Sequence, residues 1–210
     1  MKNRKNRAKI SGSMMPMAGK KKIFVLMGNP DMETLSKKMA DAYEVGALKA
    51  GHEVRRMNIS EMKYDPILHN GYRTIQELEP DLKTFQENVK WCDHFVIVYP
   101  NWWCATPALL KGLFDRAWLP GFAFNMFKNG LGWKGHFKDK TARIVMLANS
   151  SPFLQWFLFG EFTNEMQRAT LGFAGFRPVH VAVFYPSETA SEQKKKDWLL
   201  KVERWGKEGK

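Results

Sequence analysis

Short apolar runs and longer helical stretches alternate along this chain in a regular order. Runs with the composition of buried strands occupy residues 21–28, 52–59, 94–100, 142–148 and 179–185. Stretches with helical character occupy residues 33–50, 74–92, 106–118, 162–174 and 188–207. Strands separated by helices of this length form right-handed βαβ units and a parallel sheet. The sequence therefore predicts an α/β fold with a doubly wound, five-stranded parallel sheet of order 2-1-3-4-5 and helices on both faces.

Cap and turn residues indicate where these elements begin and end. Gly51 follows the first helical stretch, at the position where a left-handed residue commonly ends a helix. Thr106 and Pro107 are predicted to be the N-cap and the first residue of the third helix. Residues 119–139 form a connection rich in glycine and phenylalanine, and an aromatic loop is expected after the run at 142–148.

Composition narrows the class of protein. The chain has 210 residues, 44% of them hydrophobic, which is enough for one domain with a sizeable core. Its two cysteines, Cys92 and Cys104, are too few for a disulfide framework and indicate a reducing compartment. No run approaches the roughly 20 apolar residues of a membrane span, and no secretory signal is present. We therefore expect a soluble, cytoplasmic protein.

Basic residues are concentrated at the N-terminus. Residues 1–22 hold eight Lys or Arg and no acid, so of the formal charge of +12 only +4 belongs to the other 188 residues. Such a segment lacks the apolar surface that would order it. We expect residues 1–21 to be a basic disordered leader and residues 22–210 to form one domain. A nucleic-acid or membrane-surface arm is the alternative for the leader, with nucleic acid the less expected partner.

A polar loop follows the first apolar run, where a sheet of this order binds its ligands. Thr34 and Ser36 fall at the predicted start of a helix, where free backbone N–H groups and the positive end of the dipole attract anions. These hydroxyls either cap the helix or hold a phosphate. The loop contains neither the Gly-Lys-Ser/Thr of a Walker loop nor a Gly-x-Gly-x-x-Gly turn.

Two further loops are expected at the same edge of the sheet. After the third run, Trp102 and Trp103 either wall a flat heterocycle or cover the core, and backbone N–H groups of 101–105 can donate to a ring. After the fourth run come Asn149, Ser150 and Ser151, a composition that also suits an ordinary turn. Together the three loops describe one pocket with a phosphate end and a flat-ring end, which fits a flavin nucleotide.

The stretch "YPNWWCATPALLKGLFDRAW" (99–118) resembles the signature of flavodoxin-like NAD(P)H:quinone reductases. That group includes DT-diaphorase, the bacterial modulator-of-drug-activity proteins and the ancillary reductases of glutathione-gated potassium efflux. The matching residues are Pro100, Trp102, Trp103, Pro107, Ala108, Leu110, Lys111, Gly112, Asp115 and Arg116. The resemblance extends over about residues 22 to 185 and implies a flavodoxin-like domain.

The resemblance also implies roles for individual residues. Those expected around the flavin phosphate or pyrophosphate are Asn29, Thr34, Leu35 and Ser36. Those expected along the isoalloxazine are Pro100, Asn101, Trp102, Trp103 and Cys104, with Asn149, Ser150 and Ser151 at its other edge. Family members are usually homodimers, and Phe124 and Met126 are expected to cover the flavin of the partner subunit. Asn29 replaces a family histidine, and no catalytic proton donor is assigned.

The activity implied is that of a flavin-dependent NAD(P)H oxidoreductase with FAD or FMN. It would transfer hydride by a ping-pong mechanism to quinones or similar electrophilic aromatic compounds. The alternative is a regulatory or ancillary flavoprotein subunit bound to a membrane transporter. A one-electron carrier is disfavoured because such carriers usually dock through acidic faces, whereas the 188 residues after the N-terminal segment carry a net positive charge. The five histidines show no metal-ligand spacing, so no metal site is predicted.

Overall fold

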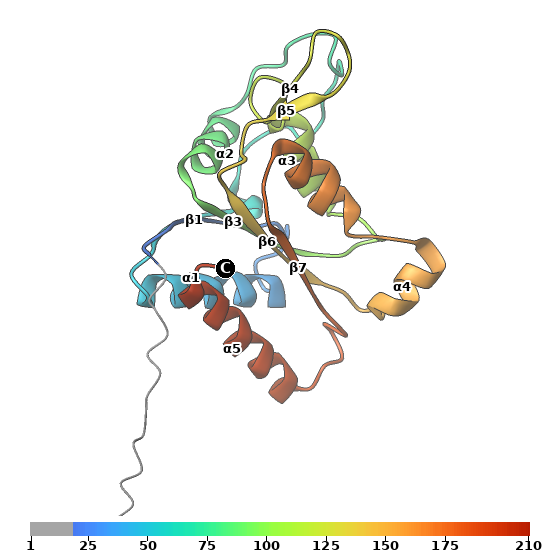
Figure 1. Cartoon of the computed structure of the whole chain (residues 1–210). Helices are drawn as coiled ribbons and strands as arrows, with labels where there is room; N and C mark the ends of the chain where they lie inside the picture. Colours follow the sequence, from blue (N-terminus) through green and yellow to red (C-terminus); the bar gives the residue numbers. More distant parts are fainter. Residues whose placement is uncertain (1–18) are drawn as a thin grey trace, which may run out of the picture.

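The computed structural model describes residues 19–210 of the chain. A five-stranded parallel sheet of order β2-β1-β3-β6-β7 forms its centre (Figure 1). The strands are β1 (Lys22–Met27), β2 (Glu53–Asn58), β3 (His94–Pro100), β6 (Thr141–Leu147) and β7 (Val179–Phe184). The predicted fold class, strand order and five strands are therefore confirmed, and the polar strand β2 lies at an edge as expected.

Helices cover both faces of this sheet. One face carries α1 and α5 and the other carries α2 and α3, while α4 projects from the side of the molecule (Figure 1). The helices are α1 (Leu35–Lys49), α2 (Pro80–Trp91), α3 (Ala108–Ala117), α4 (Pro152–Phe159) and α5 (Glu192–Glu208), with a 3-10 turn η1 (Ile59–Glu61) and a π-helix η2 (Glu165–Gly172). A small antiparallel hairpin, β4 (Phe124–Met126) and β5 (Trp133–Gly135), interrupts the connection between α3 and β6.

Alternation of side chains along the central strands divides the core into two clusters. In β1, Phe24 and Leu26 pack with α2 and α3, whereas Ile23 and Val25 pack with α1 and α5. All four side chains are fully buried. A strand buried on both faces carries apolar side chains on both of them. Its sequence is therefore a continuous apolar run rather than an alternation of apolar and polar residues.

Several predicted boundaries were wrong. Helix α2 begins at Pro80 rather than near residue 74, because proline suits the first helical turn and disfavours helix before it. Helix α3 begins at Ala108 with Pro107 as its N-cap, so Thr106 is not the cap. Helix α5 begins at Glu192 rather than 188, where the Ser191 side chain accepts a hydrogen bond from the Lys194 N–H at 3.2 Å.

The predicted aromatic loop after β6 is also wrong, because residues 152–159 form helix α4. The predicted leader lies largely outside the described residues, which begin at 19. Within residues 19–210 no helix combines the length and apolar character needed to cross a bilayer. The cytoplasmic location stays a prediction.

Helices α1 and α5 approach each other more closely than ordinary side chains allow. A Cβ atom on Gly206 would collide with the backbone carbonyl of Tyr43, and one on Gly46 would collide with the carbonyl of Glu203. Each glycine therefore lets the backbone of one helix lie against the other. This contact fixes α5 beside the first helix of the sheet and, with it, the polar residues at the start of α5.

We expect Gly206→Ala to lower the free energy of unfolding by about 1–3 kcal/mol, the usual effect of overpacking a tight contact. Urea denaturation followed by circular dichroism measures this change. Lys196→Ala is the matched control, since Lys196 is exposed on the same helix and its replacement should change stability by less than about 0.5 kcal/mol. Equal midpoints for the two variants would contradict the close approach of the helices.

Candidate functional site

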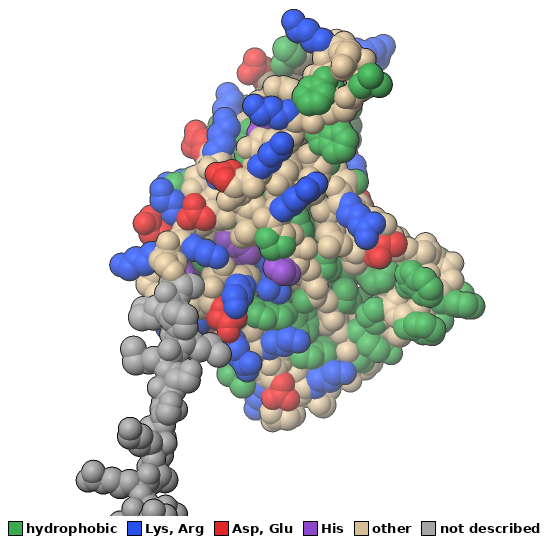
Figure 2. All heavy atoms as spheres, in the orientation of Figure 1, with side chains coloured by type: hydrophobic (Ala, Val, Ile, Leu, Met, Phe, Trp, Pro, Cys, Tyr) green, Lys and Arg blue, Asp and Glu red, His purple; other side chains and the backbone are tan. Residues whose placement is uncertain are grey.

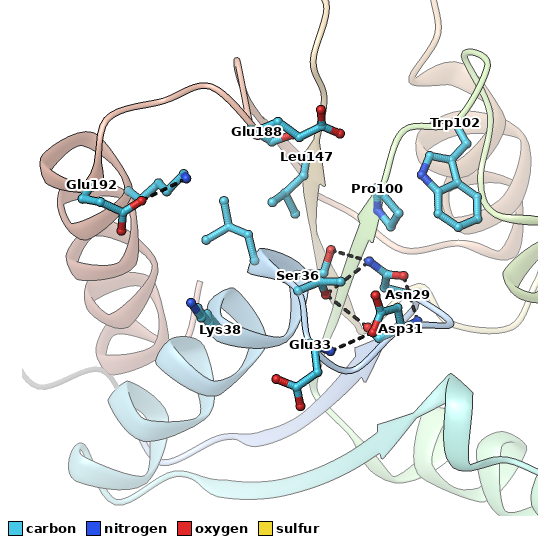
Figure 3. A pocket seen from close by; sticks show the side chains of 14 residues that line it. Asn29, Asp31, Glu33, Ser36, Lys38, Pro100, Trp102, Leu147, Glu188 and Glu192 are labelled. Atoms are coloured by element: carbon cyan, nitrogen blue, oxygen red, sulfur yellow. Dashed lines mark hydrogen bonds and ion pairs between the residues drawn. The ribbon is translucent and has the colours of Figure 1, made fainter.

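A cavity of about 430 Å³ lies beyond the carboxyl ends of the central strands. Its wall comes from the loop after β1, the ends of β3 and β6, and the segment that leads from β7 into α5 (Figure 3). This is the edge where open parallel sheets bind ligands, and the volume lies in the range of about 300–1,000 Å³ found for small-molecule sites. The location agrees with the pocket expected from the order of the strands.

One end of the cavity is polar. Asn29 is nearly buried, and its Nδ2 donates hydrogen bonds to Thr34 Oγ1 at 3.2 Å and to Ser36 Oγ at 3.3 Å. The Thr34 hydroxyl donates to the carbonyl oxygen of Asp31 at 3.1 Å, so it does not cap α1. The amide thus fixes both hydroxyls beside the start of the helix.

The first turn of α1 keeps its donors available. No described residue accepts a hydrogen bond from the backbone N–H of Leu35, Ser36 or Lys37. Free N–H groups at a helix start, together with hydroxyls and the helix dipole, form a site for a phosphate. Of the two alternatives for this loop, capping is therefore wrong, and the geometry is suited to an anion.

Charged side chains of both signs surround this polar end. Lys38 has no salt-bridge partner within residues 19–210, whereas Lys195 pairs with Glu192 at 3.1 Å. Further carboxylates in the cavity wall belong to Asp31, Glu33 and Glu188. In Figure 3, Glu192 and Lys38 lie on the side opposite Trp102. Lys38 is thus the side-chain cation best placed to balance an added negative charge.

The other end of the cavity is formed by the loop after β3. Trp102 and Ala105 exchange two backbone hydrogen bonds of 3.0 Å, which closes a two-residue turn. The central residues, Trp103 and Cys104, have φ of 54° and 58°. Residues other than glycine adopt this left-handed conformation at a cost of about 1–3 kcal/mol each, and such strain is concentrated at functional sites.

The two tryptophans of this loop differ in their surroundings. Trp102 is half exposed and lines the cavity next to Pro100, whereas the Trp103 side chain is 100% exposed. The alternative that both indoles cover the core is therefore wrong. A large aromatic side chain held in water by a strained turn is available to contact a ligand or a partner.

The loop after β6 is tied to its neighbours. Asn149 Oδ1 accepts hydrogen bonds from Ser187 Oγ at 2.8 Å and from the Glu188 N–H at 3.0 Å. The carbonyl oxygen of Ser150 accepts a hydrogen bond from Gln155 Nε2 at 2.9 Å. Leu147, the last residue of β6, lines the cavity, whereas residues 149–151 do not.

The structure thus divides the predicted site residues into three groups. Those in the cavity wall are Asn29, Thr34, Leu35, Ser36, Pro100 and Trp102. Those in the same loops but outside the wall are Asn101, Trp103, Cys104, Asn149, Ser150 and Ser151. Phe124 and Met126 are the first and last residues of β4 and do not border this cavity. Phe124 lines a second hollow between α3 and η2.

Some residues of the wall were not predicted. Ser187 and Glu188 enter it from the connection between β7 and α5, and Lys195 enters it from the first turn of α5. The signal was the polar sequence directly after the fifth apolar run, which reaches the same edge of the sheet as the other three loops. Within the described chain, no cluster of His, Cys, Asp or Glu side chains is arranged to hold a metal ion.

Helix α4 stands beside these loops and has an unusual surface. Its exposed apolar side chains are Phe153, Leu154, Trp156, Phe157, Leu158 and Phe159. They contribute to the apolar surface on the projecting part of the molecule in Figure 2. The one buried side chain of this helix is polar, that of Gln155. The helix is therefore apolar toward solvent and polar toward the protein.

Comparison with known proteins gives a consistent result. Residues 21–207 match the Flavodoxin_2 family model, which describes a flavodoxin-like fold. The chain is 27% identical over 165 residues to the ribosyldihydronicotinamide dehydrogenase (quinone) of Rattus norvegicus, a match that covers 72% of this chain and 68% of the relative.

Solved structures share the architecture. The NAD(P)H:quinone oxidoreductase from Methanothermobacter marburgensis has a TM-score of 0.76 at 21% identity, over 91% of this chain and 100% of that one. The FMN-dependent NADH-azoreductase from Bacillus anthracis, solved in complex with FMN, has a TM-score of 0.68 at 16% identity, over 88% and 97% of the two chains. The family match over most of the chain, the sheet order and these similarities show that the chain belongs to the Flavodoxin_2 family, with distant homology to NAD(P)H quinone oxidoreductases.

Proposed function

We propose that this protein is a flavin-dependent NAD(P)H oxidoreductase that reduces quinones or similar electrophilic aromatic compounds. The observation that carries the proposal is a single cavity with an anion-binding end at the start of α1 and an aromatic end at the β3 loop. The names of its relatives, a quinone-dependent dehydrogenase and an NAD(P)H:quinone oxidoreductase, support the same reaction class.

The residues present fit FAD or FMN. The free N–H groups of the first turn of α1, the Ser36 hydroxyl and Lys38 would hold a phosphate. Pro100 and Trp102 would lie against a flat ring system. Near them, Asn101 Oδ1 and Thr106 Oγ1 are buried and have no hydrogen-bond partner among the described residues. Buried polar atoms of this kind are normally satisfied, and the polar edge of a bound ring would supply partners.

The chemistry that the flavin supplies when bound is acceptance of hydride from NAD(P)H and its delivery to the quinone. The chain's part is to orient the ring and to stabilise negative charge on it through the backbone N–H groups of Trp103 and Cys104. The other N–H groups of residues 101–105 donate within the protein, to Leu147, Ala105 and Trp102, and are not available to a ring. The exposed indole of Trp103 adds an apolar face over which planar reactants can align. One shared binding place requires donor and acceptor to bind in turn, which gives ping-pong kinetics.

The purified full-length protein should show the absorbance of an oxidised flavin, and the flavin released by denaturation can be identified by mass. It should oxidise NADH or NADPH when a quinone is present, with parallel lines in double-reciprocal plots at several quinone concentrations. Lack of any flavin binding, even after incubation of the apoprotein with FMN and FAD, would contradict the proposal.

We expect Trp103→Ala to weaken flavin binding about tenfold, the effect of losing one aromatic contact of roughly 1.4 kcal/mol. The melting temperature should stay at its wild-type value because this side chain is fully exposed. Quenching of flavin fluorescence by the apoprotein measures the affinity. Tyr72→Ala removes another highly exposed aromatic side chain outside the cavity wall and should change neither quantity. Wild-type flavin affinity in Trp103→Ala would exclude the indole from the site.

We also propose that the protein is a homodimer and that the exposed apolar side chains of α4 lie in the interface. Apolar surface of this density is uncommon on a monomer and marks a docking surface. A second copy suits it because α4 contains no charged residue that would select a partner of opposite charge. Phe124 and Met126 remain the residues proposed to reach the flavin of the partner subunit.

Phe157→Glu should weaken association of the subunits at least tenfold, because burying an unpaired carboxylate is unfavourable. Sedimentation equilibrium over a range of protein concentrations gives the association constant. Leu200→Glu places the same charge on an exposed position of α5 and should leave association unchanged. A monomeric wild-type protein, or a dimer insensitive to Phe157→Glu, would remove α4 from the interface.

A further inference from the structure

Gln155 joins the two loops that flank the aromatic end of the cavity. Its side chain is only 4% exposed. Oε1 accepts a hydrogen bond from Asn101 Nδ2 at 2.6 Å, in the loop after β3, and Nε2 donates to the carbonyl oxygen of Ser150 at 2.9 Å, in the loop after β6. Cys104 Sγ also lies 4.0 Å from Oε1. The oxygen and the nitrogen of one side-chain amide are therefore each hydrogen-bonded to a different loop.

The loop after β3 needs such an anchor. Its turn places Trp103 and Cys104 in the left-handed region, where each residue is strained. Strained conformations persist only when surrounding contacts determine them more strongly than the local preference. At one end of the turn the Asn101 N–H donates to the Leu147 carbonyl at 2.7 Å, and the side chain of the same residue is held by Gln155. The turn is thus held from both its backbone and its side chain.

Helix α4 offers little other reason for a buried glutamine. Its remaining large side chains face solvent, so the amide does not fill a polar gap in an otherwise apolar contact. Burying an amide is unfavourable unless its hydrogen bonds are made, and here both are made to the loops after β3 and β6 rather than to the core. The arrangement is specific, because only a group with an acceptor and a donor at this separation satisfies both loops.

We propose that Gln155 is a positioning residue that sets the distance between the β3 and β6 loops and thereby orients the backbone N–H groups of Trp103 and Cys104, which have no acceptor among the described residues, toward the flavin ring. The inference rests on the proposed function and assigns a residue to the aromatic end of that site. Gln155 itself need not touch the ring; it acts through Asn101 and Ser150. Its loss would leave the phosphate end, built by Asn29 and Ser36, intact.

The first test is Gln155→Leu, which keeps the approximate volume and removes both hydrogen bonds. FMN and FAD are each titrated into the apoprotein, and we expect the flavin Kd to rise about tenfold. The midpoint potential of the bound flavin should become more negative, because backbone N–H groups that no longer point at the ring stabilise its reduced, negatively charged form less. A merely structural role would lower the melting temperature without moving the potential.

The matched control is Gln86→Leu. Gln86 lies on α2, and its Nε2 donates to the Ala117 carbonyl at 2.8 Å, so this variant removes one amide hydrogen bond between residues outside the cavity wall. It should reduce stability while leaving the Kd and the potential of the flavin at their wild-type values. A similar shift of the potential in both variants would overturn the proposal.

The second variant, Gln155→Glu, tests the same hydrogen bonds independently if the leucine variant folds poorly. An ionised carboxylate can accept from Asn101 but cannot donate to the Ser150 carbonyl, whereas the protonated acid does both. Burial raises the pKa of such a carboxyl above its usual value of about 4.3. Flavin affinity of this variant should therefore recover toward wild type as the pH is lowered from about 8 to about 5, a recovery that wild type lacks.

The outcomes separate this inference from the proposed function. A wild-type protein that binds neither FMN nor FAD overturns both. A wild-type protein that binds flavin, together with a Gln155→Leu variant of equal affinity and potential, overturns the inference and leaves the oxidoreductase proposal standing. A flat pH profile for Gln155→Glu at reduced affinity likewise overturns it, because the donor to Ser150 would then be irrelevant.

Discussion

The hydrogen-bond ladder of the parallel sheet continues one step past the strands, and the rest of the site depends on this step. The N–H of Gly28 donates to the Val98 carbonyl at 2.7 Å, and the N–H of Asn101 donates to the Leu147 carbonyl at 2.7 Å. Each functional loop therefore begins in register with its neighbour. Because parallel strands run in one direction, the loops after β1 and β3 and the end of β6 lie at a common level and border one cavity.

Packing between helices then fixes which residues reach the polar end of the cavity. The glycine contacts between α1 and α5 fix α5 against the helix whose first turn faces the cavity. This is why residues as distant in sequence as Ser36 and Lys195 line the same space. The aromatic end lies in the loop between β3 and α3. It relies on a strained turn and on side-chain hydrogen bonds, so the two ends are held by different kinds of interaction.

The sheet could be predicted because each of its central strands is buried on both faces and left a continuous apolar run in the sequence. The same runs located the loops, and six of the twelve proposed cofactor residues lie in the cavity wall. Thr106 shows what the pattern could not supply. It is a good N-cap by residue type, yet its hydroxyl has no partner within residues 19–210 and the helix starts after Pro107. Residue preference gives the kind of element, whereas tertiary contacts decide its first residue.

Helix α4 was not predicted because its amphipathic pattern is the reverse of the usual one. Sequence patterns identify a surface helix by apolar side chains that face the protein and polar ones that face water. In α4 this relation is reversed, since apolar residues such as Phe153 and Phe157 are exposed and Gln155 is buried. Burial of its own apolar side chains does not hold this helix in place. The two hydrogen bonds of the Gln155 amide tie it to the loops after β3 and β6, so that an exposed helix and the loops of a buried sheet are connected by the same side chain.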